Sequence, residues 1–186
     1  MDKRELIGYL ERLDNELRQP TILHIYGSAA CMLLDEPDRI SLDIDVAGPY
    51  SEADESDLRR AAALAGLPVN PDENHDSDHI EWIGPLRLCL QPPVAGKNLT
   101  LWRGGKLLVR TGSLADLVSS KLIRYDETDR SDIQYLLTQG RLTFEQIAEA
   151  ASRLPPPFAS DRLVVENLEN LRTDMDVWCG GDDDPA

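Results

Sequence analysis

Two aspartates, Asp43 and Asp45, stand two positions apart in the apolar, β-branched stretch ISLDIDVAG, which predicts a β-strand. Residues i and i+2 of a strand point to the same face, so we expect the two carboxylates side by side, with backbones about 7 Å apart. Like charges this close repel each other unless a cation lies between them. Because Mg²⁺ prefers carboxylate and phosphate oxygens, the pair predicts a site for Mg²⁺ or Mn²⁺. An acidic edge strand that faces solvent is the alternative.

A Gly-Ser pair, Gly27 and Ser28, stands between a predicted strand, TILHIYG, and a predicted helix, SAACMLLD. At such a junction the backbone N–H groups and a serine hydroxyl can approach a phosphate closely. The order strand, Gly-Ser, helix, strand and paired aspartates is more specific than either motif alone. It predicts a phosphate site at Gly27 and Ser28 beside a metal site.

This order resembles the signature of the nucleotidyltransferase superfamily that includes DNA polymerase β: a glycine followed by Gly or Ser, a short spacer and a Dx[DE] strand. The spacer after Ser28 is slightly longer here. The segment RISLDIDV is more closely similar to the R-x-[ST]-x-D-h-D-h pattern of the AbiEii-type toxin branch and its uncharacterised bacterial relatives. Arg39, Ser41, Asp43 and Asp45 stand at the matching positions. The resemblance implies that the phosphate held by the Gly-Ser pair belongs to a nucleotide.

A second segment, DLVSSKLIRYDETDRSDIQYLL, resembles another motif of the same branch, a helical lysine followed by a basic residue and aspartates. It matches with Lys121, Arg124, Asp129 and Asp132, although Arg130 follows Asp129 instead of preceding it. The resemblance implies that Lys121 and Arg124 contact nucleotide phosphates and that Asp132 helps to complete the catalytic site. The residues alone leave two other roles open: an exposed helix lysine with an acidic partner for Lys121, and a helix N-cap for Asp129.

The wider superfamily often has a third metal-linked acid on a following strand, and Glu81 in HIEWI is the candidate here. His24 precedes the Gly-Ser turn, and we expect a partly buried histidine with a satisfied hydrogen bond more than a catalytic base. His75 and His79 lie in an acidic segment and are predicted to be solvated instead of metal-binding.

The resemblance implies transfer of a nucleoside monophosphate from an NTP to the end of an RNA such as tRNA, or to a protein hydroxyl. In that reaction Asp43 and Asp45 hold Mg²⁺. It also implies a toxin–antitoxin context with a cognate antitoxin or other protein partner. Two other functions stay open: a degenerate member that binds nucleotide or a partner without catalysis, and an interaction module whose acidic C-terminal half docks a basic partner.

The charge of the chain limits its partners. The 186 residues carry a net charge of −15, which argues against nonspecific nucleic-acid binding by the whole surface. Residues 97–141 are the exception, with 8 basic and 5 acidic residues, so a polyanionic ligand would approach there unless these are ordinary solvated charges. No apolar run reaches the ~20 residues of a membrane span, and the charged N-terminus lacks the centre of a signal peptide. We therefore expect a bacterial cytoplasmic protein with no membrane partner.

The order of the predicted elements indicates an α+β fold that ends in a helical subdomain. The resemblance implies that the first part is a nucleotidyltransferase-like mixed sheet with flanking helices. Predicted domains are 1–112, an α/β core, and 113–179, helices that complete the site, with a disordered tail over 180–186. HIEWI and LRLCLQP are predicted to pair as strands, and LTLWRGGKLLVRT to form a hairpin. A helix over residues 51–67 is predicted to begin at a Ser51 cap.

Overall fold

The computed structural model describes residues 1–72 and 75–179, and it is an α+β protein. The predicted disordered tail, 180–186, lies outside the described residues. The strands are β1 (Thr21–His24), β2 (Asp43–Ala47), β3 (His79–Ile83), β4 (Leu99–Arg103) and β5 (Leu107–Thr111). The helices are α1 (Lys3–Glu16), α2 (Gly27–Leu33), α3 (Glu55–Ala65), α4 (Leu114–Ser120), α5 (Glu127–Gly140), α6 (Phe144–Ser152) and α7 (Arg162–Cys179), with short 3-10 turns η1 (Gly48–Tyr50) and η2 (Phe158–Ser160).

The chain divides into two compact units. The first comprises residues 1–88 and 93–113 and contains the five strands with α1, α2 and α3. The second comprises Cys89–Pro92 and, among the described residues, 114–179. The sequence did not indicate that Cys89–Pro92 belong with the helices. There the Gln91 side-chain carbonyl accepts a hydrogen bond from Arg153 Nε at the end of α6, at 2.7 Å.

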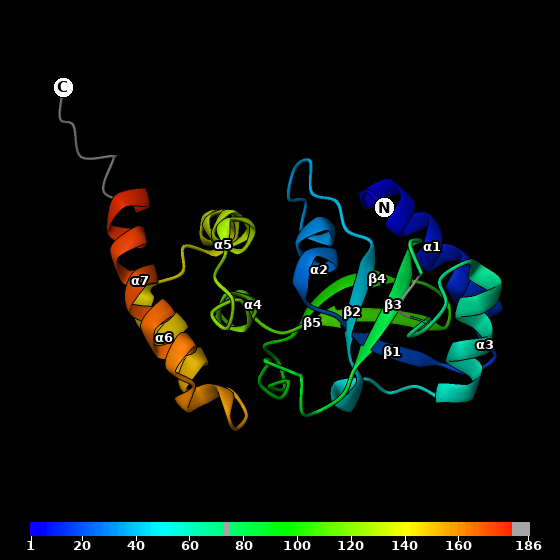
Figure 1. Cartoon of the computed structure of the whole chain (residues 1–186). Coiled ribbons are helices and arrows are strands. Elements are labelled where there is room, and N and C mark those ends of the chain that lie inside the picture. The colour runs from blue at the N-terminus through cyan, green and yellow to red at the C-terminus, as the bar shows by residue number, and fades with distance from the viewer. Residues whose placement is uncertain (73–74, 180–186) are drawn as a thin grey trace. The chain divides into compact units, whose positions relative to one another are not determined.

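The strands of the first unit form two small sheets (Figure 1). In one, β1 runs parallel to β5 and β4 runs antiparallel to β5, which confirms the predicted β4–β5 hairpin. In the other, β2 and β3 are parallel. An antiparallel bridge between Ile25 and Val46 joins the end of β1 to β2. The Gly-Ser turn and the paired aspartates are thereby neighbours in the fold.

The prediction that HIEWI pairs with LRLCLQP is wrong. HIEWI is β3, but its partner is β2, and LRLCLQP forms no strand. After β3 the chain turns, with Arg87 N–H bonded to the Gly84 carbonyl at 3.2 Å. Leu88 and Leu90 are buried, so the apolar residues that suggested a strand serve core packing instead.

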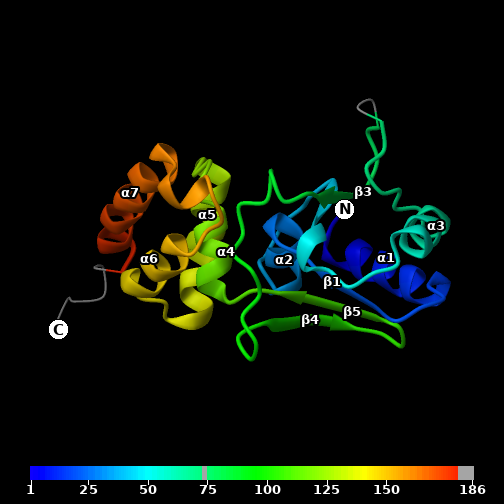
Figure 2. The same ribbon diagram turned by 90° about the horizontal axis from the view of Figure 1, so that it is seen from below.

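Helices α1 and α2 cover one face of the β1–β5–β4 sheet, and α3 packs beside α1 (Figure 2). Leu6, Leu10 and Leu13 of α1 are fully buried, as their helical spacing predicts. Helix α3 begins at an Asp54 cap and not at Ser51. The Ser51 hydroxyl instead accepts a hydrogen bond from His24 N–H at 3.0 Å and donates to the Ala47 carbonyl at 3.0 Å.

His24 of β1 is only 3% exposed, and its Nδ1 atom has no hydrogen-bond partner among the described residues. The expected satisfied hydrogen bond is therefore wrong. Burial, assisted by the nearby Arg110 guanidinium, lowers the pKa of His24 to about 4. The folded protein thus holds this imidazole in its neutral form, while the unfolded chain protonates it at its ordinary pKa of about 6.5.

This difference predicts a stability that falls with acidification. Because the folded pKa of His24 lies below its unfolded pKa, protonation of His24 favours the unfolded chain. This loss in the free energy of unfolding is absent above about pH 6.5 and grows as the pH falls from about 6.5 to about 4. We expect the free energy of unfolding in urea to be about 2 kcal/mol lower at about pH 5 than at about pH 8. A His75→Gln control keeps this dependence and His24→Gln flattens it, and equal wild-type stability at both pH values would contradict the prediction.

In the second unit α4 packs on α5 and α6, and α6 packs on α7. Tyr125, before α5, donates its hydroxyl to Asp174 of α7 at 2.6 Å, and Arg130 pairs with the same carboxylate at 3.0 Å. Across the described residues, no helix combines the length and apolar character that crossing a membrane requires.

Candidate functional site

Three carboxylates meet on one face of the β2–β3 sheet. In the parallel register Asp45 lies opposite Glu81, and Asp43 lies one side-chain repeat earlier on the same face. One carboxylate oxygen of each of the three lies within 4.8 Å of the others. All three side chains are half-buried, while Ile44 and Ile80 between them are buried on the opposite face. We call Asp43, Asp45 and Glu81 on this sheet face the platform. Its apolar far face makes it rigid, and its acidic oxygens lie close enough to share one divalent cation.

The Gly-Ser turn lies directly against this platform. Tyr26 N–H donates to the Asp45 carbonyl at 3.1 Å, which holds the end of β1 beside β2. Gly27 has a φ of +64°, and an ideal Cβ added there would overlap Oδ2 of Asp45. Glycine is therefore required twice at this position, for the left-handed backbone and for the close approach of the carboxylate. The Gly-Ser turn and the paired aspartates are therefore neighbours, as predicted, with Gly27 packed against Asp45.

Replacing Gly27 with alanine should destabilise the fold and displace the Asp45 carboxylate. The left-handed backbone alone costs about 1–2 kcal/mol for a residue with a Cβ. The overlap with Asp45 adds to this, so we expect a total loss of about 2–4 kcal/mol in urea unfolding. Gly96→Ala is the matched control, because Gly96 has a φ of +78° with no atom near its Cβ position. Equal losses in the two variants would show that Asp45 does not crowd the turn.

Arg39 and Ser41 of the RISLDIDV motif each hydrogen-bond to a part of the site: Arg39 to the Gly-Ser turn and Ser41 to the platform. The Arg39 guanidinium donates to the Ser28 hydroxyl, and its Nε atom lies 4.0 Å from Glu36 Oε2. The Ser41 hydroxyl donates to Asp43 Oδ1 at 2.7 Å. These contacts orient one acid and the serine of the turn, which gives the matched motif residues a local physical role.

Sequence reasoning missed Arg87, whose guanidinium donates to Glu81 Oε1 at 2.8 Å. The only sequence signal is a basic residue six positions after an acid, and this spacing predicts no contact in an extended chain. The Gly84–Arg87 turn is what returns the side chain to β3.

The second motif forms a buried ion cluster within the second unit. Lys121 Nζ lies 2.5 Å from Asp132 Oδ2 and 3.2 Å from Asp129 Oδ1, and all three side chains are at most 6% exposed. Arg124 makes a two-pronged contact with Asp129, at 2.8 and 2.9 Å. Burial works to raise the pKa of Asp129, but the neighbouring Arg124 and Lys121 outweigh it and hold that pKa below its usual value.

Several expectations for this segment need correction. Lys121 does not lie inside a helix but in the turn after α4, where its N–H bonds the Val118 carbonyl at 3.1 Å. It is also buried, so the alternative of an exposed helix lysine is wrong. The N-cap of α5 is Asp126, which accepts a hydrogen bond from Asp129 N–H, and not Asp129 itself. Local spacing identified the residues but not which of the three aspartates caps the helix.

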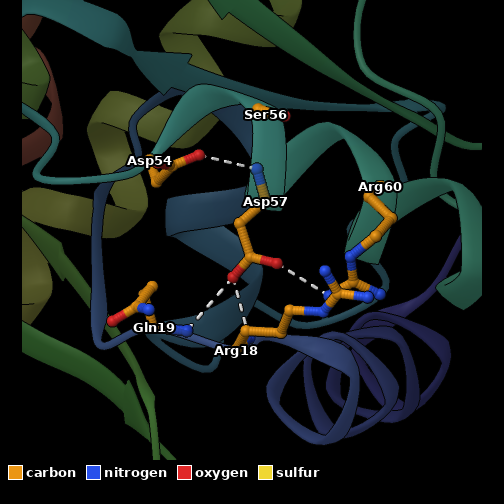
Figure 3. Close-up of a pocket in the computed structure, with 6 residues that line it drawn as sticks. All are labelled: Arg18, Gln19, Asp54, Ser56, Asp57 and Arg60. Atoms are coloured by element: carbon orange, nitrogen blue, oxygen red, sulfur yellow. Dashed lines mark hydrogen bonds and ion pairs between the residues drawn. The ribbon is translucent and has the colours of Figure 1, made fainter.

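A pocket of about 250 Å³ lies at the end of α1 and the start of α3 (Figure 3). Its central acid, Asp57, accepts hydrogen bonds from Arg18 N–H at 2.7 Å, from Gln19 N–H at 3.1 Å and from the Arg60 guanidinium at 2.7 Å. The Asp57 carboxylate is thus engaged in joining two helices, and none of the platform carboxylates lines this pocket. We therefore place the candidate site at the platform.

Comparisons of the chain with models of protein families, with curated proteins and with solved structures find no match. The features that indicate a function are therefore the platform, the turn and the residues around them.

Proposed function

We propose that the protein is a Mg²⁺-dependent nucleotidyltransferase with a nucleotidyltransferase-like fold, which transfers a nucleoside monophosphate from an NTP to an RNA or protein hydroxyl. The observation that carries this proposal is the close approach of Gly27 to Asp45 in a cluster of three carboxylates. A phosphate-binding turn and a cation-binding platform in contact are what the transfer of a phosphoryl group from a metal-bound triphosphate requires.

Electrostatics favour a cation at the platform. Three carboxylates with oxygens within 4.8 Å of one another repel, and a divalent ion removes that repulsion. Purely structural acids are usually neutralised by buried basic partners or by helix N-termini. Here the three side chains are half-buried, and Glu81 pairs with the exposed Arg87 at 2.8 Å. A ligand set of carboxylates favours Mg²⁺ or Mn²⁺ over zinc.

Each residue then has a defined part. Asp43 and Asp45 would ligate the ion, with Glu81 as a third carboxylate, and Ser41 orients Asp43 through its hydrogen bond. Ser28 would donate to a phosphate oxygen from the turn. When bound at the platform, Mg²⁺ would supply positive charge that stabilises the charge developing on the phosphates during transfer. The roles that the resemblance implies for Lys121, Arg124 and Asp132 stay predictions.

The test measures binding and transfer separately. Calorimetric titration with ATP, CTP, GTP and UTP in the presence of Mg²⁺ identifies the nucleotide. Incubation with that NTP, labelled at the α-phosphate, and with bulk RNA or candidate protein partners then reveals transfer. We expect label in RNA that depends on the divalent ion and is absent with EDTA.

Other outcomes distinguish the remaining functions. Tight nucleotide binding with no label in any acceptor would favour a non-catalytic binder. A stoichiometric partner that copurifies equally with wild type and with Asp43→Ala would favour an interaction module. Failure to bind either Mn²⁺ or any NTP would overturn the proposal.

A further inference from the structure

The Arg87 side chain reaches back from the turn after β3 to the third carboxylate of the platform. Its NH2 atom lies 2.8 Å from Glu81 Oε1, and the two side chains are 72% and 29% exposed. The contact therefore lies at the outer edge of the platform, where a ligand from solvent would enter. Unlike Asp43, which is oriented by a neutral hydroxyl, Glu81 is oriented by a full positive charge.

The positive charge of Arg87 acts on more than its direct partner. The hydrogen bond and charge of Glu81 raise the pKa of Arg87 most, and the more distant Tyr26 and Asp45 add to the same effect. The guanidinium thus lies within the field of the platform and of the residue that precedes the Gly-Ser turn. One arginine partly neutralises an acidic cluster that lies beside a candidate phosphate site.

A divalent ion and the Arg87 guanidinium would compete for the negative charge of Glu81. A divalent ion shared by Asp43, Asp45 and Glu81 would cancel two of the three negative charges and so weaken the attraction for the guanidinium. Arginine has five N–H donors in a planar fork that matches phosphate oxygens. A guanidinium released at the edge of the platform would meet the triphosphate that the same ion binds.

We propose that Arg87 is an exchangeable counter-cation of the platform: it holds Glu81 while no divalent ion is bound and passes to a phosphate oxygen of the NTP when the ion arrives. The inference rests on the proposed function. It adds that metal and nucleotide binding are coupled through this one side chain, and that removal of Arg87 has opposite effects on the two ligands.

The experiment titrates Mn²⁺ by electron paramagnetic resonance at low ionic strength, first without nucleotide. Exposed ion pairs contribute about 0.2–1 kcal/mol, so we expect Arg87→Ala to bind Mn²⁺ about 1.4- to 5-fold more tightly than wild type. Arg59→Ala is the matched control, because it removes the same charge from an exposed pair with Glu55 on α3. The control should bind Mn²⁺ as wild type does, within experimental error.

A second titration measures the affinity for the preferred NTP in saturating Mn²⁺. Charge-assisted hydrogen bonds to phosphate are strong, and we expect Arg87→Ala to bind the NTP about 10-fold more weakly, with Arg87→Lys between the two. Arg59→Ala should again match wild type. The opposite signs for metal and nucleotide are the signature of exchange, because a merely structural arginine would weaken both or neither.

The outcomes separate this inference from the proposed function. Mn²⁺ binding that is lost in Asp43→Asn but unchanged in Arg87→Ala would overturn the exchange and leave the metal site intact. Tighter Mn²⁺ binding with unchanged NTP affinity would equally overturn it, since the guanidinium would then not pass to the phosphates. A wild-type protein that binds no Mn²⁺ would overturn both proposals.

Discussion

Replacing Asp45 with asparagine is expected to abolish divalent-ion binding while leaving the fold at least as stable as wild type. Asp45 is central to the platform, because a Cβ on Gly27 would overlap its Oδ2 atom and one of its oxygens lies within 4.8 Å of one oxygen each of Asp43 and Glu81. Asparagine keeps the shape but removes one of three like charges, so the repulsion of Asp45 with Asp43 and with Glu81 is lost. We expect the free energy of unfolding to be unchanged within about 0.5 kcal/mol or to rise.

The loss of function in the same variant should be large. Changes even to residues that only support metal ligands cost about 10- to 100-fold in metal affinity or activity, so loss of a ligand should lower label transfer by at least about 100-fold. Mn²⁺ titration and transfer of label from the NTP measure the two effects. Asp76→Asn, an exposed acid in the polar loop before β3, is the control and should retain both.

Stability and Mn²⁺ binding measured in the same Asp45→Asn variant distinguish a metal ligand from a structural acid. Most substitutions at structural acids destabilise, whereas acids gathered for a ligand are held against their mutual repulsion. A variant that is clearly less stable but still binds Mn²⁺ would show that Asp45 serves the fold and not a metal site.

Replacing Lys121 with methionine is expected to produce the largest loss of stability in the second unit. The ammonium lies 2.5 Å from Asp132 and 3.2 Å from Asp129, in a cluster whose side chains are at most 6% exposed. Asp129 keeps its contact with Arg124, but Asp132 loses the cation beside it. Removing one partner of a buried ion pair typically costs about 3–5 kcal/mol, and we expect a loss of this size in urea unfolding.

A second substitution separates charge from packing. In Lys121→Met with Asp132→Asn the buried carboxylate charge that faced Lys121 is gone, so the double variant should be more stable than Lys121→Met alone. Lys97→Met, which removes an exposed lysine, should change stability by less than about 0.5 kcal/mol. If Lys121→Met is as stable as Lys97→Met, the buried cluster contributes nothing to folding.

The sequence alone determined those features that depend on short spacing. Alternation in ISLDIDVAG placed Asp43 and Asp45 on one face, and the residue types around Gly27 and Ser28 predicted the strand–turn–helix order that the structure has. The β4–β5 hairpin followed from its two glycines, and the α+β class followed from the order of elements. In each case the signal lies within a few residues, where backbone geometry fixes which side chains are neighbours.

Only the tertiary structure decided the pairing of distant segments. Glu81 could be named as a candidate, but its place opposite Asp45 depends on the parallel register of β2 with β3. The same pairing overturned the predicted partner of HIEWI, because sequence periodicity does not say which strand lies beside which. The Arg87–Glu81 pair and the burial of Lys121 arise in the same way. Both depend on turns that bring a side chain back against another element. A pattern of residue types along the chain does not indicate which distant side chains then come into contact.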